Sequence, residues 1–77
     1  MLNAERKIQL GKRIREVREK QKLSQRQLAL MMGNESHSYL SEVERGVTNP
    51  SFDYLCSLAD ALDVEISYFF VSDFGDE

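Results

Sequence analysis

A helix-capping pattern near the middle of the chain constrains its fold more than any other feature of the sequence. Ser24 and Gln27 have the spacing of a capping box, in which the two side chains bond backbone N–H groups that are free at the start of a helix. The apolar positions that follow recur at helical spacing and stop at Gly33, a residue that favours a helix end because it adopts positive φ without strain. The pattern predicts a short helix over residues 25–32.

A second short helix is predicted directly after a turn. The residues Asn-Glu-Ser at positions 34 to 36 favour a turn, and Ser36 can cap the next helix. Leu40 and Val43 are spaced i, i+3 and form its buried side, and Gly46 ends it. The expected helix spans residues 37–45. Two short capped helices joined by a tight turn are the pattern of a helix-turn-helix.

A longer helix is expected before this pair, over residues 4–21. Asn3 is a candidate N-cap, and Glu5 lies in the first turn, where a carboxylate interacts favourably with the helix dipole. One side of the helix carries an apolar stripe, whereas the positions between are mostly charged. The stripe consists of Leu10, Ile14, Val17 and Gln21.

A fourth helix is expected after a loop. Gly46 and Pro50 favour non-helical backbone, and Ser51 then caps a helix that ends at Asp63. The apolar positions of this helix form one continuous face. They are Phe52, Leu55, Leu58, Ala59 and Leu62.

The apolar segment 64–70 fits either a strand or a last helical turn. Nothing else in the chain alternates with period two, so a lone strand would lack a partner, and a short helix over residues 66–71 is predicted. The expected fold is therefore all-α, with five helices. The chain of 77 residues is expected to form one compact domain over residues 1–77, with its core at about 10–70 and an acidic tail at 72–77.

The charge is unevenly distributed along the chain. The formal net charge is -3, yet residues 1–26 carry nine basic and three acidic side chains, while residues 27–77 carry one basic and ten acidic ones. A local basic field attracts a polyanion regardless of the net charge, so this asymmetry points to nucleic acid or another anionic surface. A merely solvated helix face is the alternative interpretation.

Several classes of protein are disfavoured by composition. The single Cys56 cannot form an internal disulfide, and with the single His37 it cannot supply a structural zinc site. The residues match no nucleophilic triad, metal-binding or phosphate-loop spacing, so we expect no enzyme, no cofactor and no metal. No apolar run is long enough to span a bilayer, and the N-terminus lacks the apolar region of a signal peptide. We therefore expect a cytoplasmic protein, with no membrane partner and no evident small-molecule effector.

The second helix of the pair offers a polar face for recognition. If Leu40 and Val43 point inward, a rotation of about 100° per residue places a polar set outward. Such outward residues meet base edges in the major groove in a helix-turn-helix. Ser38, Ser41, Glu42 and Arg45 point outward, with His37 and Tyr39 on the flanks.

Two of these side chains leave alternatives open. Glu42 either accepts a hydrogen bond from cytosine N4 or excludes sequences by repelling phosphate. Tyr39 either packs on the preceding helix beside Met32 or contacts a phosphate, and both roles are compatible.

Three stretches, LSQRQLALMMG, SYLSEVERG and NPSFDYLCSLADALDV, together resemble the Cro/phage-repressor-type helix-turn-helix proteins, also called the XRE family. The resemblance covers residues 10–70. It implies a five-helix, lambda-repressor-like domain with the helix-turn-helix at helices 2 and 3. It also implies a sequence-specific transcriptional regulator that binds a palindromic operator in double-stranded DNA as a homodimer.

The resemblance also assigns roles to individual residues. Gln25 would bond a phosphate and brace the recognition helix, and Arg18 and Glu44 would form a structural pair between helices 1 and 3. The turn between Gly33 and Leu40 is one residue longer than the commonest family spacing, which leaves open whether Ser36, His37 or Ser38 leads into the groove. The candidate base-reading residues are His37, Ser38, Tyr39, Ser41 and Glu42. The candidate phosphate contacts are Ser24, Gln25, Arg26, Arg45, Thr48 and Asn49.

Apolar residues near the C-terminus predict a homodimer, because exposed apolar patches usually mark interfaces. Phe69 could fill the core, which leaves Phe70, Val71 and Phe74 as the candidate interface. Within the class of regulators, the sequence is compatible with restriction-modification controllers and with phage Cro-like proteins. An antitoxin, which binds a partner protein and also represses its own operon, is the alternative function.

Overall fold

Residues 2–70, the part of the chain that the computed structural model describes, form four α-helices and one 3₁₀ helix. The predicted all-α class is confirmed, and of the five predicted helices four are α-helices, whereas the last is a 3₁₀ helix. The elements are α1 (Leu2–Lys20), α2 (Gln25–Met31), α3 (Ser38–Arg45), α4 (Phe52–Leu62) and the 3₁₀ helix η1 (Ile66–Phe70). The predicted acidic tail at 72–77 lies outside the described residues.

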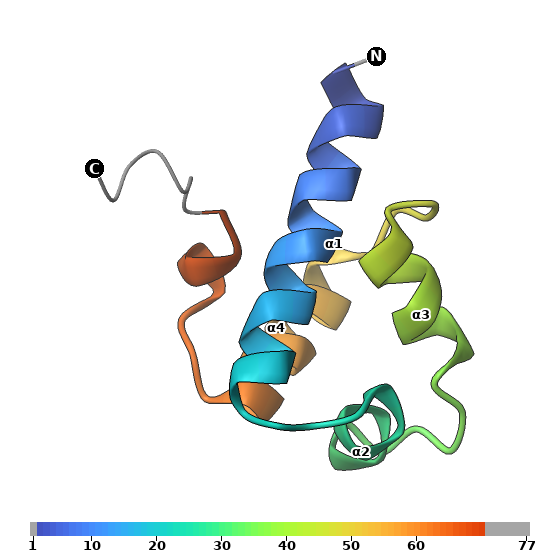
Figure 1. Ribbon diagram of the computed structural model, residues 1–77, viewed down its shortest axis with the longest axis vertical. Coiled ribbons are helices and arrows are strands. Elements are labelled where there is room, and N and C mark those ends of the chain that lie inside the picture. Colours follow the sequence, from blue (N-terminus) through green and yellow to red (C-terminus); the bar gives the residue numbers. More distant parts are fainter. Residues whose placement is uncertain (1, 71–77) are drawn as a thin grey trace.

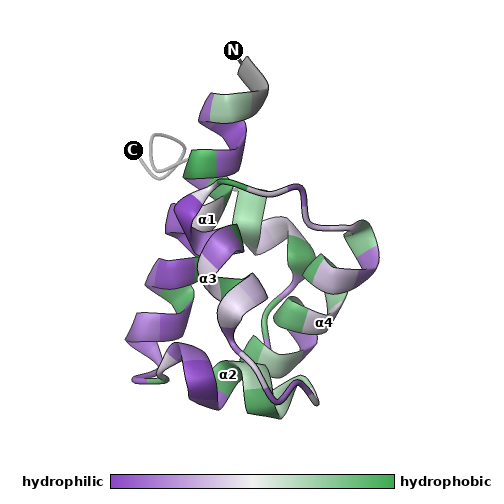
Figure 2. Ribbon diagram, turned by 90° about the vertical axis from the view of Figure 1, so that its right-hand side faces the viewer, coloured by the Kyte–Doolittle hydropathy of each residue, from purple (hydrophilic) through white to green (hydrophobic). Residues whose placement is uncertain are grey.

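The elements are arranged around the long helix α1. Figure 1 shows α3 on one side of α1 and η1 on the other, with α2 at the bottom of the view, below α3. The described part of the chain is elongated, with extents of 35 × 25 × 20 Å. Figure 2 shows that α1 is predominantly hydrophilic, whereas much of α4 is hydrophobic.

The predicted helix caps set most of the helix boundaries. Ser24 Oγ accepts a hydrogen bond from the N–H of Gln27 at 3.0 Å, and the Gln27 side chain accepts one from the Ser24 N–H, as a capping box requires. Ser51 caps α4 by accepting from the N–H of Tyr54 at 3.0 Å. Gly46, at the end of α3, is left-handed with φ of 75°. These three predictions are confirmed.

Two predicted helix starts differ from the structure. The first helix begins at Leu2, so Asn3 lies within it and is not the N-cap. The N-cap of α3 is His37, which makes no side-chain cap bond, and the helix begins at Ser38 instead of His37. Ser36 takes part from one position further out, because its Oγ accepts from the Ser38 N–H at 3.1 Å. The start of α3 therefore lies one residue later than predicted.

The last element is a short 3₁₀ helix that contacts α1. The Tyr68 N–H donates to the carbonyl of Glu65 at 2.9 Å, which is 3₁₀ spacing. The Tyr68 carbonyl accepts from Arg13 Nε at 3.1 Å, and the Arg13 guanidinium lies 4.3 Å from the centre of the Tyr68 ring. A five-residue segment with these contacts to α1 gains its stability from packing more than from its own hydrogen bonds.

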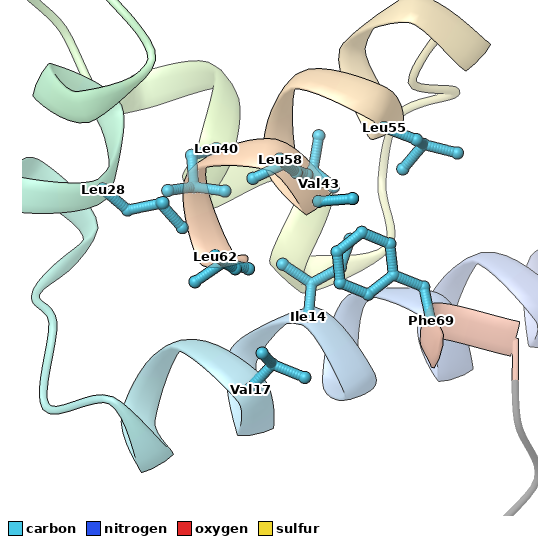
Figure 3. Packing of buried hydrophobic residues seen from close by; sticks show 10 residues of the cluster. Ile14, Val17, Leu28, Leu40, Val43, Leu55, Leu58, Leu62 and Phe69 are labelled. Atoms are coloured by element: carbon cyan, nitrogen blue, oxygen red, sulfur yellow. The ribbon is translucent and has the colours of Figure 1, made fainter. Parts of the chain in front are cut away.

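Buried side chains from every element meet in one core, in which Phe69 of η1 packs toward Ile14 of α1 (Figure 3). Gln21, predicted as part of the apolar stripe, is exposed and donates to the carbonyl of Leu62 at 2.7 Å. Phe52 was predicted in the core face of the fourth helix, but 69% of it is exposed because it lies at the first position of α4, beyond the buried residues. The core consists of Ile14, Val17, Leu28, Ala29, Leu40, Val43, Leu55, Leu58, Ala59, Leu62 and Phe69.

Two glycines allow α1 to approach α3 more closely than side chains would permit. A Cβ built on Gly11 would lie 2.4 Å from the carbonyl oxygen of Glu44 and 2.5 Å from that of Val43. A Cβ built on Gly46 would lie 2.7 Å from the Cα of Ile8. The backbone of α1 therefore packs directly against the end of α3, and this contact sets the position of the helix that the sequence predicts to recognise DNA.

Candidate nucleic-acid interface

The turn between α2 and α3 reverses the chain at a left-handed glycine. Gly33 has φ of 85°, and a Cβ at this position would meet no atom within 4 Å, so its backbone conformation, and not space, favours glycine. The Asn34 N–H donates to the carbonyl of Ala29 at 2.9 Å and closes the end of α2. This turn orients α3 so that Leu40 and Val43 are buried and the other side of the helix faces outward.

The outward side of α3 carries the residues that the sequence predicts to read bases. His37, Ser38 and Tyr39 are exposed, whereas Ser41 and Glu42 are half-buried. The Ser36 hydroxyl donates to Ser38 Oγ at 3.1 Å, so these two serines form a small hydrogen-bonded pair at the start of the helix. Ser38, Tyr39, Ser41 and Glu42 lie on the first two turns of α3, and His37 lies at its N-cap.

The buried side of α3 ends in an ion pair with α1. Arg18 donates from Nε to Glu44 Oε2 at 2.7 Å and from Nη2 to Oε1 at 2.9 Å, which is a bidentate geometry. Arg18 Nη1 also donates to the carbonyl of Leu23 at 2.8 Å, in the segment that leads into α2. Both charged residues are 8% exposed. This network joins α1, the start of α2 and the end of α3.

Gln25 extends the same network into the first turn of α2. Its side-chain amide donates to Glu44 Oε1 at 2.9 Å, so this carboxylate accepts bonds from both Arg18 and Gln25. Within residues 2–70, no buried side-chain nitrogen or oxygen lacks a hydrogen-bond partner. Gln25 therefore bonds to α3 through Glu44, whereas its bracing role and its contact with a phosphate remain predictions.

The other candidate phosphate contacts lie at two ends of the helix-turn-helix. Ser24, Gln25 and Arg26 lie at the N-terminal end of α2, and Arg26 is exposed. Arg45 and Asn49 are exposed and Thr48 is half-buried, at the end of α3 and in the loop that follows it. The structure thus separates the predicted donors into two groups, one at the start of α2 and one at the end of α3 and in the loop that follows it.

Tyr39 has a neighbour that sequence reasoning did not identify. Its ring meets the Tyr54 ring of α4 edge-on, with centroids 4.9 Å apart and planes at 89°. The predicted packing partner was Met32, but the ring contact found is with Tyr54. Burial raises the pKa of Tyr54 to about 12. Contact between the third and fourth helices has no signal in local helical spacing, so the sequence alone could not indicate it.

Basic side chains on α1 are partly neutralised by acidic neighbours. Arg15 Nε donates to Glu19 Oε2 at 2.9 Å. This hydrogen bond raises the pKa of Arg15 and lowers that of Glu19. Arg13 pairs with Glu16 at 3.3 Å. At least two of the nine basic side chains of residues 1–26 are therefore paired with carboxylates of the same helix.

The candidate dimer contacts are only partly described. Phe70 is 62% exposed at the end of η1, whereas Val71 and Phe74 lie outside the described residues.

Across residues 2–70, no cluster of three or more His, Cys, Asp or Glu side chains has an arrangement that could hold a metal ion. None of the helices in the described part of the chain combines the length and the apolar character that a membrane span needs.

These elements define a helix-turn-helix domain of the DNA-binding type, with α2 and α3 as the two helices of the motif. A helix-turn-helix family model, HTH_3, matches residues 14–69, and the chain belongs to this family. The resemblance predicted from the sequence is therefore confirmed. The family is one of transcriptional regulators, which agrees with the expectation that the chain is not an enzyme.

Curated relatives support the same assignment. The chain is 43% identical over 58 residues to the immunity repressor protein of Bacillus phage phi105, a match that covers 75% of this chain and 40% of the relative. It is 44% identical over 62 residues to the HTH-type transcriptional regulator SlrR of Bacillus subtilis (strain 168), covering 79% of this chain and 40% of that protein. The chain thus spans less than half the length of these curated relatives.

Solved structures share the fold. The restriction-modification controller protein C.AhdI from Aeromonas hydrophila superposes with a TM-score of 0.78 at 41% identity, covering 82% of this chain and 94% of that one. An HTH_3 family transcriptional regulator from Vibrio cholerae superposes with a TM-score of 0.83 at 28% identity, covering 92% of this chain and 39% of that one. The lambda-repressor-like arrangement is thus confirmed for the helices, with a 3₁₀ turn in place of the fifth.

Proposed function

We propose that this chain is a sequence-specific transcriptional regulator that inserts α3 into the major groove of double-stranded DNA. The observation that carries the proposal is the two-sided character of α3. Its inner side is locked to α1 and α2 through Glu44, which accepts bonds from Arg18 and Gln25. Its outer side presents polar side chains to solvent. A rigidly held helix with a free polar face is what reading of base edges requires.

The two groups of donors outside α3 would set its register on the duplex. Phosphates on one side of the groove would be contacted by Gln25 and Arg26 at the N-terminal end of α2, and those on the other side by Thr48 and Asn49. His37, Ser38, Ser41 and Glu42 would then face the base edges. Acidic Glu42 would accept from cytosine N4 and disfavour other bases at its position.

Binding is proposed to occur as a homodimer on a palindromic operator. Phe70 supports an interface at the C-terminal end, because a large aromatic side chain is left 62% exposed there. In a two-fold dimer of this class the recognition helices enter successive major grooves about 34 Å apart. Similarity to a phage immunity repressor and to a restriction-modification controller supports a regulatory role.

Selection of bound DNA from a random pool tests the proposal. We expect an enriched palindrome whose half-sites are separated by about one helical turn, and binding that weakens steeply as salt rises. Ser38→Ala and Ser41→Ala should change the enriched sequence, whereas Ser57→Ala, which removes an exposed serine hydroxyl from α4, should not. An unenriched pool, or affinity that does not respond to salt, would refute DNA recognition. If no operator is enriched and a second polypeptide co-purifies with the chain, the antitoxin function is favoured.

A further inference from the structure

Tyr39 lies on the recognition helix, yet its contacts are with the protein. The ring stands perpendicular to that of Tyr54 at a centroid distance of 4.9 Å. The hydroxyl donates to the carbonyl oxygen of Asn49 at 3.4 Å. Edge-to-face pairs of this kind are favourable beyond the area they bury. The side chain therefore has two protein partners, although 40% of it is exposed.

The two partners belong to different elements. Asn49 lies in the loop between α3 and α4, and Tyr54 lies in the first turn of α4. This loop begins at left-handed Gly46 and ends at Ser51, whose Oγ accepts from the Tyr54 N–H. Tyr39 therefore links the first turn of α3 to the middle of the loop and to the start of the next helix.

We propose that Tyr39 is a positioning residue that holds the loop of residues 46–51 at a fixed distance from the recognition helix, and not a residue that reads bases. This inference rests on the proposed function, in which the loop supplies phosphate contacts through Thr48 and Asn49. Contacts to bases and to phosphates must form together, so a preset separation between α3 and the loop favours binding. Tyr54 then contributes to DNA affinity through Tyr39, from a half-buried place in α4.

A double-mutant cycle tests this link on the DNA enriched by selection. Tyr39→Leu and Tyr54→Leu should each weaken DNA binding by about twofold to tenfold, which is the range expected when one aromatic pair is lost. The double variant should bind DNA no more weakly than whichever single variant has the lower affinity, because both changes remove the same contact. Tyr54→Phe keeps the ring and should bind like the wild type. Tyr68→Phe, which removes a tyrosine hydroxyl from η1, is the matched control.

The loop itself provides a readout that needs no DNA. In the free protein, backbone ¹⁵N relaxation should show lower order parameters for Thr48 and Asn49 in Tyr39→Phe, which loses the hydroxyl but keeps the ring. This variant keeps the edge-to-face contact, so it tests the link even if Tyr54→Leu fails to fold. The same residues in Tyr68→Phe should retain wild-type order.

Results of two kinds would overturn the proposal, one on DNA affinity and one on the order of the loop. The first is wild-type affinity in a folded Tyr54→Leu variant, or a double variant whose loss equals the product of the two single losses, because Tyr39 would then act on DNA directly. The second is unchanged order of Thr48 and Asn49 in Tyr39→Phe. If no DNA is enriched at all, the proposed function fails, while the relaxation measurement still decides whether Tyr39 holds the loop.

Discussion

Arg18 and Glu44 form a bidentate ion pair, with Nε to Oε2 at 2.7 Å and Nη2 to Oε1 at 2.9 Å, between residues that are each 8% exposed. The Gln25 side-chain amide also donates to the Glu44 carboxylate, and the Leu23 carbonyl accepts a bond from the Arg18 guanidinium. One buried carboxylate thus connects the long N-terminal helix to both helices of the helix-turn-helix. The orientation of α3 depends on this connection and on the close contact at Gly11.

Glu44→Ala is expected to destabilise the fold by about 3–5 kcal/mol, because it leaves the Arg18 charge buried without its partner. The midpoint of urea denaturation measures the effect. Replacing both residues together, as in Arg18→Met with Glu44→Leu, should recover much of the loss, since no unpaired charge remains. A midpoint that does not move in Glu44→Ala would show that the pair contributes nothing to stability.

Gly11→Ala is expected to be destabilising even though alanine favours helix by about 1 kcal/mol relative to glycine. The new Cβ would lie 2.4 Å from the Glu44 carbonyl oxygen, which is backbone and cannot rotate away. We expect α1 and α3 to separate at a cost on the order of 1–3 kcal/mol. Thermal unfolding beside Lys12→Ala, a change at the neighbouring exposed position, measures it. Increased stability in Gly11→Ala would contradict the close approach.

Ser38→Ala and His37→Ala are expected to relax base preference by about 1–3 kcal/mol for each base contact that is lost, with little change in stability. Both side chains are exposed, and the Ser38 hydroxyl bonds only locally, to Ser36. Competition between the selected operator and single-base variants measures the preference. A fall in melting temperature with unchanged preference would assign these side chains to the fold instead.

Tyr54 is expected to make stability sensitive to alkaline pH. Its pKa is raised by burial from 10.0 to about 12, so the folded state binds the phenolic proton more tightly than the unfolded chain does. The corresponding stability is fully present below the unfolded pKa and is lost as the pH rises through about 12. Denaturation midpoints across this range should fall less steeply in Tyr54→Phe than in the wild type. If the midpoints of the two proteins fall in parallel with pH, Tyr54 is not the cause of the alkaline loss of stability.

The helix ends were predictable because their causes are local. Ser24, Ser51 and Gly46 each act on backbone groups within a few residues, and the structure contains the bonds or conformations expected of them. The start of α3 was less predictable, because the extra turn residue lets Ser36 bond the Ser38 N–H while His37 occupies the cap position. Local rules thus located the helices to within about two residues, which is the usual variation of helix ends.

The outward side of α3 followed from periodicity, since burial of Leu40 and Val43 fixes which residues face away from the core. The neighbours of those residues did not follow from it. Tyr54 was not expected beside Tyr39, and Phe52 was expected in the core but is exposed. Both depend on where α4 begins relative to α3, which is a distance in space and not a spacing in sequence.

The sequence by itself determined the all-α class, the helix-turn-helix, the family resemblance and the polar side of α3, because caps, glycines and helical periodicity act over a few residues. The tertiary structure alone decided how closely α1 approaches α3 at Gly11, how η1 is held as a 3₁₀ helix by Arg13, and which residues Tyr39 contacts. These features come from atoms that are distant in the sequence, and only the packing of whole helices brings them together.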